Sequence, residues 1–336
     1  MALLELSTNG IYCKQGDFYI DPWKPVHKAI ITHAHSDHAK AGHQAYLCHP
    51  LTTIILEVRL GKYNYQSINW NEPIYINGVK ISLHPAGHVI GSSQIRVEYK
   101  GEIWVVSGDY KTEDDGLSGN FEPLKCHTFI TESTFGLPVY QWKSQKEYYN
   151  EVQNWISKNQ SNGFHSVLYA YSLGKAQRIA DAVSGISDTI YVHGSVWNLH
   201  QVLREAGINL PKVNRMNLEN KKNINNHSVI IAPASAAGTP WINQLGAYKT
   251  AFCSGWMQIR GQTKRNPSDH GFAISDHADW SGLLNAIKAT QAEKVLATHG
   301  FTSILIRYLN ENGIQAEELR TEFGEEEHLN DNQIYS

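Results

Sequence analysis

The feature that most constrains this chain is a run of imidazoles and one carboxylate near its start. Residues 29–43 read AIITHAHSDHAKAGH, so an apolar run leads directly into His33, His35, Asp37 and His38. Protonated imidazoles this close together repel one another, and they are poor material for a hydrophobic core. Neutral imidazole nitrogens and a carboxylate oxygen are instead the ligands that zinc and related divalent cations take. The spacing therefore predicts a metal-binding loop at the end of a strand.

Three further residues of metal-ligand type stand at the ends of apolar segments. His88 lies in PAGHVIGS, where flanking glycines let the backbone bend closely around a ligand. Asp109 follows the apolar segment EIWVVSG, and His299 ends KVLATHG. Each alone is typical of a surface or capping residue, but beside the HxHxDH run they become candidate ligands.

The chain of 336 residues is long enough for about two domains. Residues 1–137 read as short strands, residues 138–270 alternate strands with helices, and residues 271–336 return to the first style. The expected helices cover residues 51–61, 144–160, 196–207, 280–290 and 301–313. Because alternating strands and helices are typical of parallel βαβ units, we expect an α/β fold in which one domain is interrupted by an inserted α/β domain.

Composition bears on the cellular compartment of the protein and on the class of partner it binds. No run of eighteen apolar residues is present, and the first residues lack the pattern of a signal peptide, so we expect no membrane span and a cytoplasmic protein. The four cysteines are far apart, which fits reduced thiols. The net charge of −3 is unlike that of proteins that only coat nucleic acid. It does not exclude a nuclease, because bound cations add positive charge where a phosphate sits.

The HxHxDH run, the glycine-flanked His88 and Asp109 after an apolar strand together resemble the metallo-β-lactamase family. That resemblance implies an αββα sandwich with two divalent cations at one edge, most simply zinc, with manganese or iron as alternatives. It also implies that Asp21, at the end of DFYID, orients a ligand imidazole. The ligand set it implies is His33, His35 and His88 for the first cation, Asp37, His38 and His299 for the second, and Asp109 for both.

Glu132 in TESTFG, His277 in SDHAD and His299 in THG, together with the long insertion, are similar to the three additional motifs of the β-CASP nuclease group. This resemblance implies that the inserted domain caps the metal edge and that nucleic acid enters between the domains. It makes Asp37, Glu132 and His277 the catalytic residues, with His277 as a general acid that Glu132 orients. Taken alone, an acid in a TES turn is also typical of a helix cap or a surface ion pair.

Longer segments, among them YIDPWKPV, YSLGKAQRIA and AISDHADWSGLL, extend the similarity over nearly the whole chain to bacterial exonucleases linked to an ATP-dependent DNA ligase and a helicase. These are relatives of the Artemis and cross-link repair nucleases. The implied function is a DNA exonuclease of repair, in which two cations about 4 Å apart activate a hydroxide that attacks phosphorus. An RNA-processing nuclease is the alternative, because that branch carries a histidine at the place of His299. A non-catalytic scaffold fits less well, since each expected ligand is present.

Five residues are softer candidates for binding the nucleic-acid backbone. Ser172 and Lys175 lie in YSLGKAQR, a strand-to-helix turn without P-loop spacing, and Ser235 lies in a similar turn. Arg260 and Lys264 belong to the basic loop RGQTKR. Phosphate contacts are one reading of these residues, and a capped helix with a solvated loop is equally consistent with the pattern.

Overall fold

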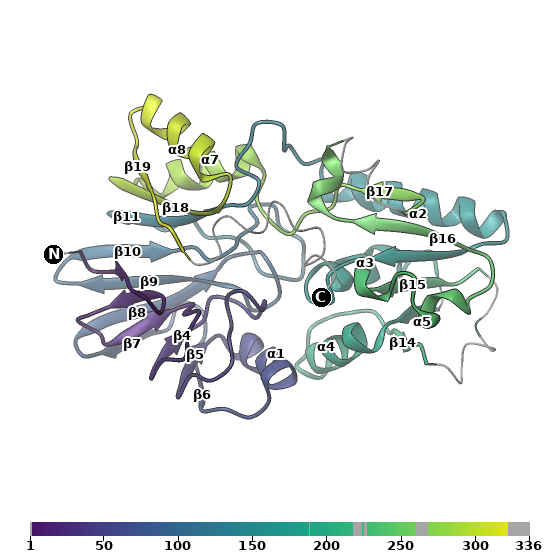
Figure 1. The fold of residues 1–336 in the computed structure, drawn as a ribbon, viewed down its shortest axis with the longest axis horizontal. Helices are drawn as coiled ribbons and strands as arrows, with labels where there is room; N and C mark the ends of the chain where they lie inside the picture. Colours follow the sequence, from purple (N-terminus) through teal and green to yellow (C-terminus); the bar gives the residue numbers. More distant parts are fainter. Residues whose placement is uncertain (1, 188, 218–223, 225–226, 260–267, 322–336) are drawn as a thin grey trace. The chain divides into compact units, whose positions relative to one another are not determined.

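A computed structural model describes residues 2–187, 189–217, 224, 227–259 and 268–321 (Figure 1). The chain forms two compact units. Among the described residues, unit 1 comprises residues 2–141 and 277–321, and unit 2 comprises those between Trp142 and Asp276. In the described part of the chain, none of the helices combines the length and the apolar character needed to cross a bilayer.

Unit 1 contains two sheets among its described residues. The first has the strand order β1-β2-β3-β4-β5-β6, and the second has the order β19-β18-β11-β10-β9-β8-β7. The first sheet consists of β1 (Glu5–Leu6), β2 (Ile11–Cys13), β3 (Phe18–Ile20), β4 (Ala29–Ile30), β5 (Tyr46–Cys48) and β6 (Tyr65–Ser67). The second consists of β7 (Pro73–Ile76), β8 (Val79–Pro85), β9 (Ser93–Tyr99), β10 (Glu102–Val106), β11 (Thr128–Ser133), β18 (Lys294–Gly300) and β19 (Gln315–Glu318).

The second sheet of unit 1 is covered on both faces. Ile130 of β11 belongs to a buried cluster shared with the first sheet, whereas its neighbour Phe129 packs with helix residues such as Leu283 and Leu305. Successive side chains of a strand point to opposite faces, so a strand buried on both sides reads as one continuous apolar run. The helices on the outer face are α7 (Trp280–Thr290) and α8 (Thr302–Glu311), which Figure 1 shows beside β18 and β11.

Several sequence-based expectations for unit 1 are confirmed. The helix expected at residues 51–61 is α1 (Pro50–Leu60), and α7 and α8 lie within the two segments expected to be helical near the C-terminus. β9 and β10 form the expected antiparallel hairpin around Lys100 and Gly101. Both turn residues have positive φ, 52° and 85°, as the two-residue turns that match strand twist require.

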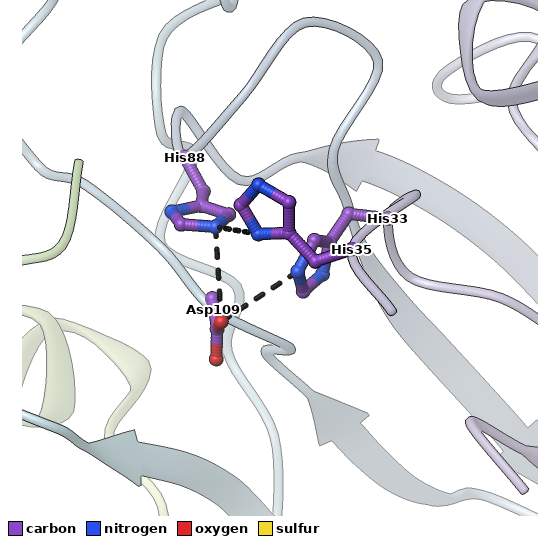
Figure 2. Close-up of side chains that lie close together, drawn as sticks. All are labelled: His33, His35, His88 and Asp109. Atoms are coloured by element: carbon purple, nitrogen blue, oxygen red, sulfur yellow. Dashed lines mark hydrogen bonds and ion pairs between the residues drawn. The ribbon is translucent and has the colours of Figure 1, made fainter. Parts of the chain in front are cut away.

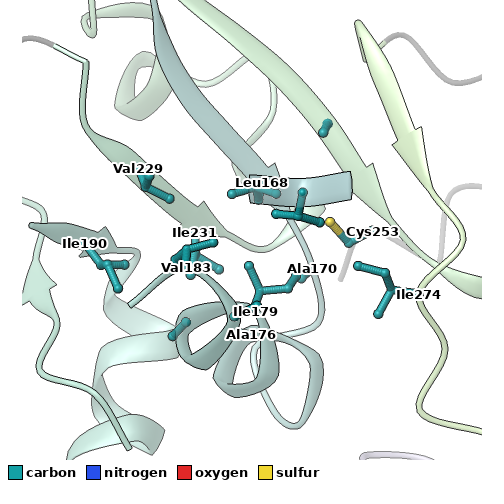
Figure 3. Close-up of a cluster of buried hydrophobic side chains, with 14 of the residues drawn as sticks. Leu168, Ala170, Ala176, Ile179, Val183, Ile190, Val229, Ile231, Cys253 and Ile274 are labelled. Carbon is teal, nitrogen blue, oxygen red and sulfur yellow. The ribbon is translucent and has the colours of Figure 1, made fainter. Parts of the chain in front are cut away.

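Unit 2 is an open parallel sheet with helices packed on it, as the alternating pattern predicts. Its strand order is β14-β13-β15-β12-β16-β17. The strands are β12 (His165–Tyr169), β13 (Ile190–Val192), β14 (Asn214–Arg215), β15 (Val229–Ala232), β16 (Tyr248–Cys253) and β17 (His270–Phe272). The helices are α2 (Gln145–Ser161), α3 (Lys175–Val183), α4 (Gly194–Glu205) and α5 (Pro240–Asn243). Figure 3 shows α3 side chains such as Ile179 packed against Leu168 and Ile231 of the sheet.

One segment of unit 2 differs from the sequence-based expectations. The apolar run at 227–238 is a strand only as far as Ala232, because Pro233 begins a 3₁₀ turn over Ala234–Ala236. β17 pairs in parallel with β16 within unit 2, which extends to Asp276.

Candidate metal centre

The candidate site of unit 1 gathers where strands end. His33 follows β4, His88 follows β8 and Asp109 follows β10. Glu132 and His299 are close to the last residues of β11 and β18. Because β10, β11 and β18 run parallel to one another, their carboxyl ends meet at one edge of the sheet. The topology therefore brings together side chains that are far apart in the sequence.

Figure 2 shows His33, His35 and His88 pointing toward one another beside Asp109. One ligand atom from each of these four residues lies within 4.8 Å of the others. His88 Nε2 lies 3.0 Å from His35 Nδ1. Asp109 Oδ2 lies 3.6 Å from His33 Nε2 and 3.7 Å from His88 Nε2. Three imidazoles and one carboxylate thus surround a common point.

A second group adjoins the first through Asp109. Asp109 Oδ1, the other carboxylate oxygen, lies 3.5 Å from His38 Nε2. Asp37 Oδ2 is 3.7 Å from the same nitrogen, and Asp37, His38 and His33 also offer ligand atoms within 4.8 Å of one another. The His299 ring stacks on that of His38 with centroids 5.2 Å apart. Each oxygen of Asp109 therefore faces a different group of candidate ligands.

Asp21 contacts Nδ1 of His38, the ring nitrogen that does not face Asp109. Asp21 Oδ2 lies 2.7 Å from His38 Nδ1 and also accepts a hydrogen bond of 2.5 Å from the Thr32 hydroxyl. The backbone N–H of Thr32 donates to Asp21 Oδ1 at 2.8 Å. A carboxylate at Nδ1 favours a proton on that nitrogen, which leaves Nε2 as the ring nitrogen of His38 that faces Asp109.

Burial and the neighbouring carboxylates shift the pKa values of the clustered imidazoles in opposite directions. Burial lowers the pKa of His33 well below its usual range. Burial also opposes protonation of His38, but the carboxylates of Asp109 and Asp37 outweigh it and raise the pKa of His38 well above its usual range. Among the described residues, Nε2 of His33 and Nε2 of His38 are buried without a hydrogen-bond partner. Since buried polar atoms are normally paired, these nitrogens fit a divalent cation as the missing partner.

Glu132 and His277 form a pair at the same edge. Glu132 is 1% exposed within β11, so it is neither a helix cap nor part of a surface ion pair. Its Oε1 accepts the backbone N–H of Tyr110 at 2.7 Å, and its Oε2 lies 2.9 Å from His277 Nδ1. Asp109, Glu132 and His277 also offer ligand atoms within 4.8 Å of one another. A carboxylate that holds Nδ1 leaves Nε2 of the imidazole for proton transfer.

The softer candidates lie in unit 2 or outside the described residues. Ser172 follows β12 and lies 2.9 Å from the Ser195 hydroxyl, and Ser235 is exposed after β15. Lys175 is buried, and its Nζ lies 3.3 Å from Asp276 Oδ2. The N–H of Gly174 at the start of α3 is already taken by the side chain of Gln177, at 2.7 Å. Arg260 and Lys264 lie outside the described residues.

No motif in the sequence singles out Thr32, although its hydroxyl contacts both Asp21 and His33. The Thr32 Oγ1 atom lies 3.1 Å from His33 Nδ1 in addition to its bond to Asp21. The one sequence signal for it is its place between an apolar strand and His33.

Comparison with known proteins gives relatives of two kinds. The chain is 27% identical over 314 residues to a probable DNA ligase of Opitutus terrae, in a match that covers 92% of this chain and 30% of the ligase. It is 31% identical over 116 residues to endoribonuclease YSH1 of Eremothecium gossypii, covering 34% of this chain and 15% of that protein. It is 27% identical over 116 residues to cleavage and polyadenylation specificity factor 73 of Drosophila melanogaster, covering 34% and 17%.

The chain thus spans less than a third of the length of these curated relatives. No protein-family model matches it. Among solved structures, it shares a fold with a protein of unknown function from Enterococcus faecalis V583, with a TM-score of 0.62, 12% identity, and coverage of 89% of this chain and 80% of that one. The resemblance drawn from the sequence motifs is confirmed by the curated relatives: this chain is related to the β-CASP nucleases of the metallo-β-lactamase fold.

Proposed function

We propose that this chain is a metal-dependent DNA exonuclease of DNA repair. In this proposal residues 1–137 and 271–336 form an αββα metallo-β-lactamase sandwich, and residues 138–270 form an inserted β-CASP domain. The observation that carries the proposal is the buried cluster of imidazoles around Asp109, whose Nε2 atoms on His33 and His38 have no hydrogen-bond partner among the described residues. Two sheets that share a core, with helices outside the second, support the fold.

The proposed ligands are the residues expected from the sequence. His33, His35 and His88 would hold the first cation, Asp37, His38 and His299 would hold the second, and Asp109 would serve both. When bound, the cations neutralise the charge of a phosphodiester and make water a nucleophile at neutral pH. Asp21 fixes the tautomer of His38 so that Nε2 faces the centre.

Glu132 and His277 complete the proposed reaction on the leaving-group side. Glu132 holds the His277 ring through Nδ1, and we assign Nε2 as the atom that donates a proton to the leaving O3′. The products are a 5′-phosphate and a 3′-hydroxyl. We assign Ser172, Lys175, Ser235, Arg260 and Lys264 to contacts with the nucleic-acid backbone. Of these, Ser235 is exposed and so accessible to a ligand, whereas Lys175 is buried and its Nζ faces Asp276.

The choice of DNA rests on the extent of similarity. The match to a probable DNA ligase covers 92% of this chain, whereas the matches to the endoribonuclease YSH1 and to factor 73 cover 34%. Because this sequence is similar to part of a longer probable ligase, we also propose an ATP-dependent DNA ligase, and with it a helicase, as partners. RNA processing is the second candidate, which the 31% identity to YSH1 and the presence of His299 favour.

A matched pair of substrates separates these functions. Metal-depleted protein is incubated with end-labelled DNA and RNA of one sequence, single- and double-stranded, with zinc or manganese added back. We expect metal-dependent shortening of DNA from an end, with a rate on RNA at least about tenfold lower, a difference of about 1.4 kcal/mol in the barrier. Faster cleavage of RNA would instead establish the second candidate. If neither DNA nor RNA is cleaved with either metal, the result would contradict both nuclease functions and favour a non-catalytic scaffold.

A further inference from the structure

Helix α1 of unit 1 contacts both of the loops that supply the first three imidazoles. The Thr52 hydroxyl donates a hydrogen bond of 2.8 Å to the carbonyl of Gly91, in the loop that carries His88. The Arg59 guanidinium donates through Nη1 to the carbonyl of Ala34, which lies between His33 and His35. Thr52 and Ala34 are each 1% exposed, so these contacts are inside the unit.

The two contacts come from one face of the helix. Thr52 and Arg59 are seven residues apart, which is two helical turns, or about 10 Å along the axis. The loop around Gly91 fits tightly, because Gly91 has a φ of +84° and an added Cβ would meet the backbone nitrogen of Thr52 at 2.8 Å. The far ends of the same two loops meet where His35 Nδ1 lies 3.0 Å from His88 Nε2. The helix therefore sets the separation of the two ligand loops.

Arg59 contributes more than a neutral donor would. Burial lowers the pKa of its guanidinium, while the Asp37 carboxylate acts in the opposite direction. Hydrogen bonds from a charged donor are stronger than those between neutral groups, so a guanidinium holds the Ala34 carbonyl firmly.

We propose that Arg59 and Thr52 are positioning residues of the metal centre. Through them, helix α1 holds the His33–His35 loop and the His88 loop at the separation that a cation requires. The inference rests on the metal centre of the proposed function. It does not require that the substrate be DNA.

The test measures metal affinity rather than activity. Zinc binding to the full chain is measured by competition with a chromogenic chelator, and apo thermal unfolding is recorded for each variant. Arg59→Met keeps an unbranched apolar stem but removes the guanidinium donors, and Thr52→Val replaces one hydroxyl with a methyl group at nearly constant shape. Loss of a group that orients metal ligands typically weakens metal binding about 10–100-fold, and we expect a loss in that range for Arg59→Met. Arg59→Lys should recover part of it.

The matched control is Arg307→Met on α8, where an exposed guanidinium bonds Glu311 at 2.8 Å. Zinc affinity of the control should equal that of the wild type. Wild-type zinc affinity in both Arg59→Met and Thr52→Val would overturn the inference. It would also be overturned if Arg59→Met and Arg59→Lys lost equal zinc affinity and both losses followed a lower apo melting temperature. If Arg59→Met does not fold, Thr52→Val alone decides. A wild-type chain that binds no zinc or manganese would instead refute the proposed function.

Discussion

Asp109→Asn is expected to lower the rate of phosphodiester hydrolysis by about 10³-fold or more. The substitution keeps the shape of the side chain but removes the negative charge whose two oxygens face His33 and His88 on one side and His38 on the other. Cations in such sites contribute several kcal/mol of charge stabilisation in the transition state, and each 1.36 kcal/mol is tenfold in rate. The measurement is the single-turnover rate on end-labelled DNA, together with the metal content of the purified variant.

A matched control separates this effect from a general loss of acidic charge. Asp17→Asn makes the same chemical change in unit 1 at an exposed position, where Asp17 bonds the Tyr12 hydroxyl at 2.8 Å. Its rate should stay within about twofold of the wild type, since exposed substitutions of this kind have small effects. Full activity in Asp109→Asn, with metal still bound, would remove Asp109 from the active centre.

His277→Asn is expected to lower kcat on DNA by about 10²–10⁴-fold, the usual contribution of a general acid. Glu132→Gln should give a smaller loss, because the proposed role of Glu132 is only to orient His277, whose Nδ1 lies 2.9 Å from Glu132 Oε2. The discriminating measurement uses thymidine 5′-(4-nitrophenyl phosphate), whose leaving group departs without a proton. On that ester the loss in His277→Asn should shrink to less than about tenfold, because the step that the imidazole assists is no longer demanding.

His27→Asn is the control for loss of an imidazole, since His27 is 41% exposed beside Asp17. It should leave both substrates unaffected. An equal loss on DNA and on the nitrophenyl ester in His277→Asn would contradict proton donation and would indicate that His277 contributes by binding substrate or metal.

The parts of this account that the sequence predicts are those with a short-range signal. His33, His35, Asp37 and His38 stand within six residues, and the spacing alone indicates a metal loop. Helices α1, α7 and α8 follow from apolar periodicity together with stop signals such as Gly61 after α1. β1 and β5, of two and three residues, carry too little periodicity to be recognised.

The parts that the sequence does not predict depend on long-range contacts. Nothing near Arg59 in the sequence indicates that it bonds Ala34, and nothing near Thr52 indicates Gly91. Lys175 shows the same limit, because nothing near it in the sequence indicates that its Nζ lies 3.3 Å from Asp276 Oδ2. Asp21 is identified by resemblance to a family, and the structure places its Oδ2 2.7 Å from His38 Nδ1.

The most direct test of the central claim is a crystal of the full chain grown with zinc and measured at the zinc absorption edge. The account predicts two anomalous peaks that share Asp109, one among His33, His35 and His88, and one among Asp37, His38 and His299. Peaks at other side chains, or none in the presence of ample zinc, would contradict it.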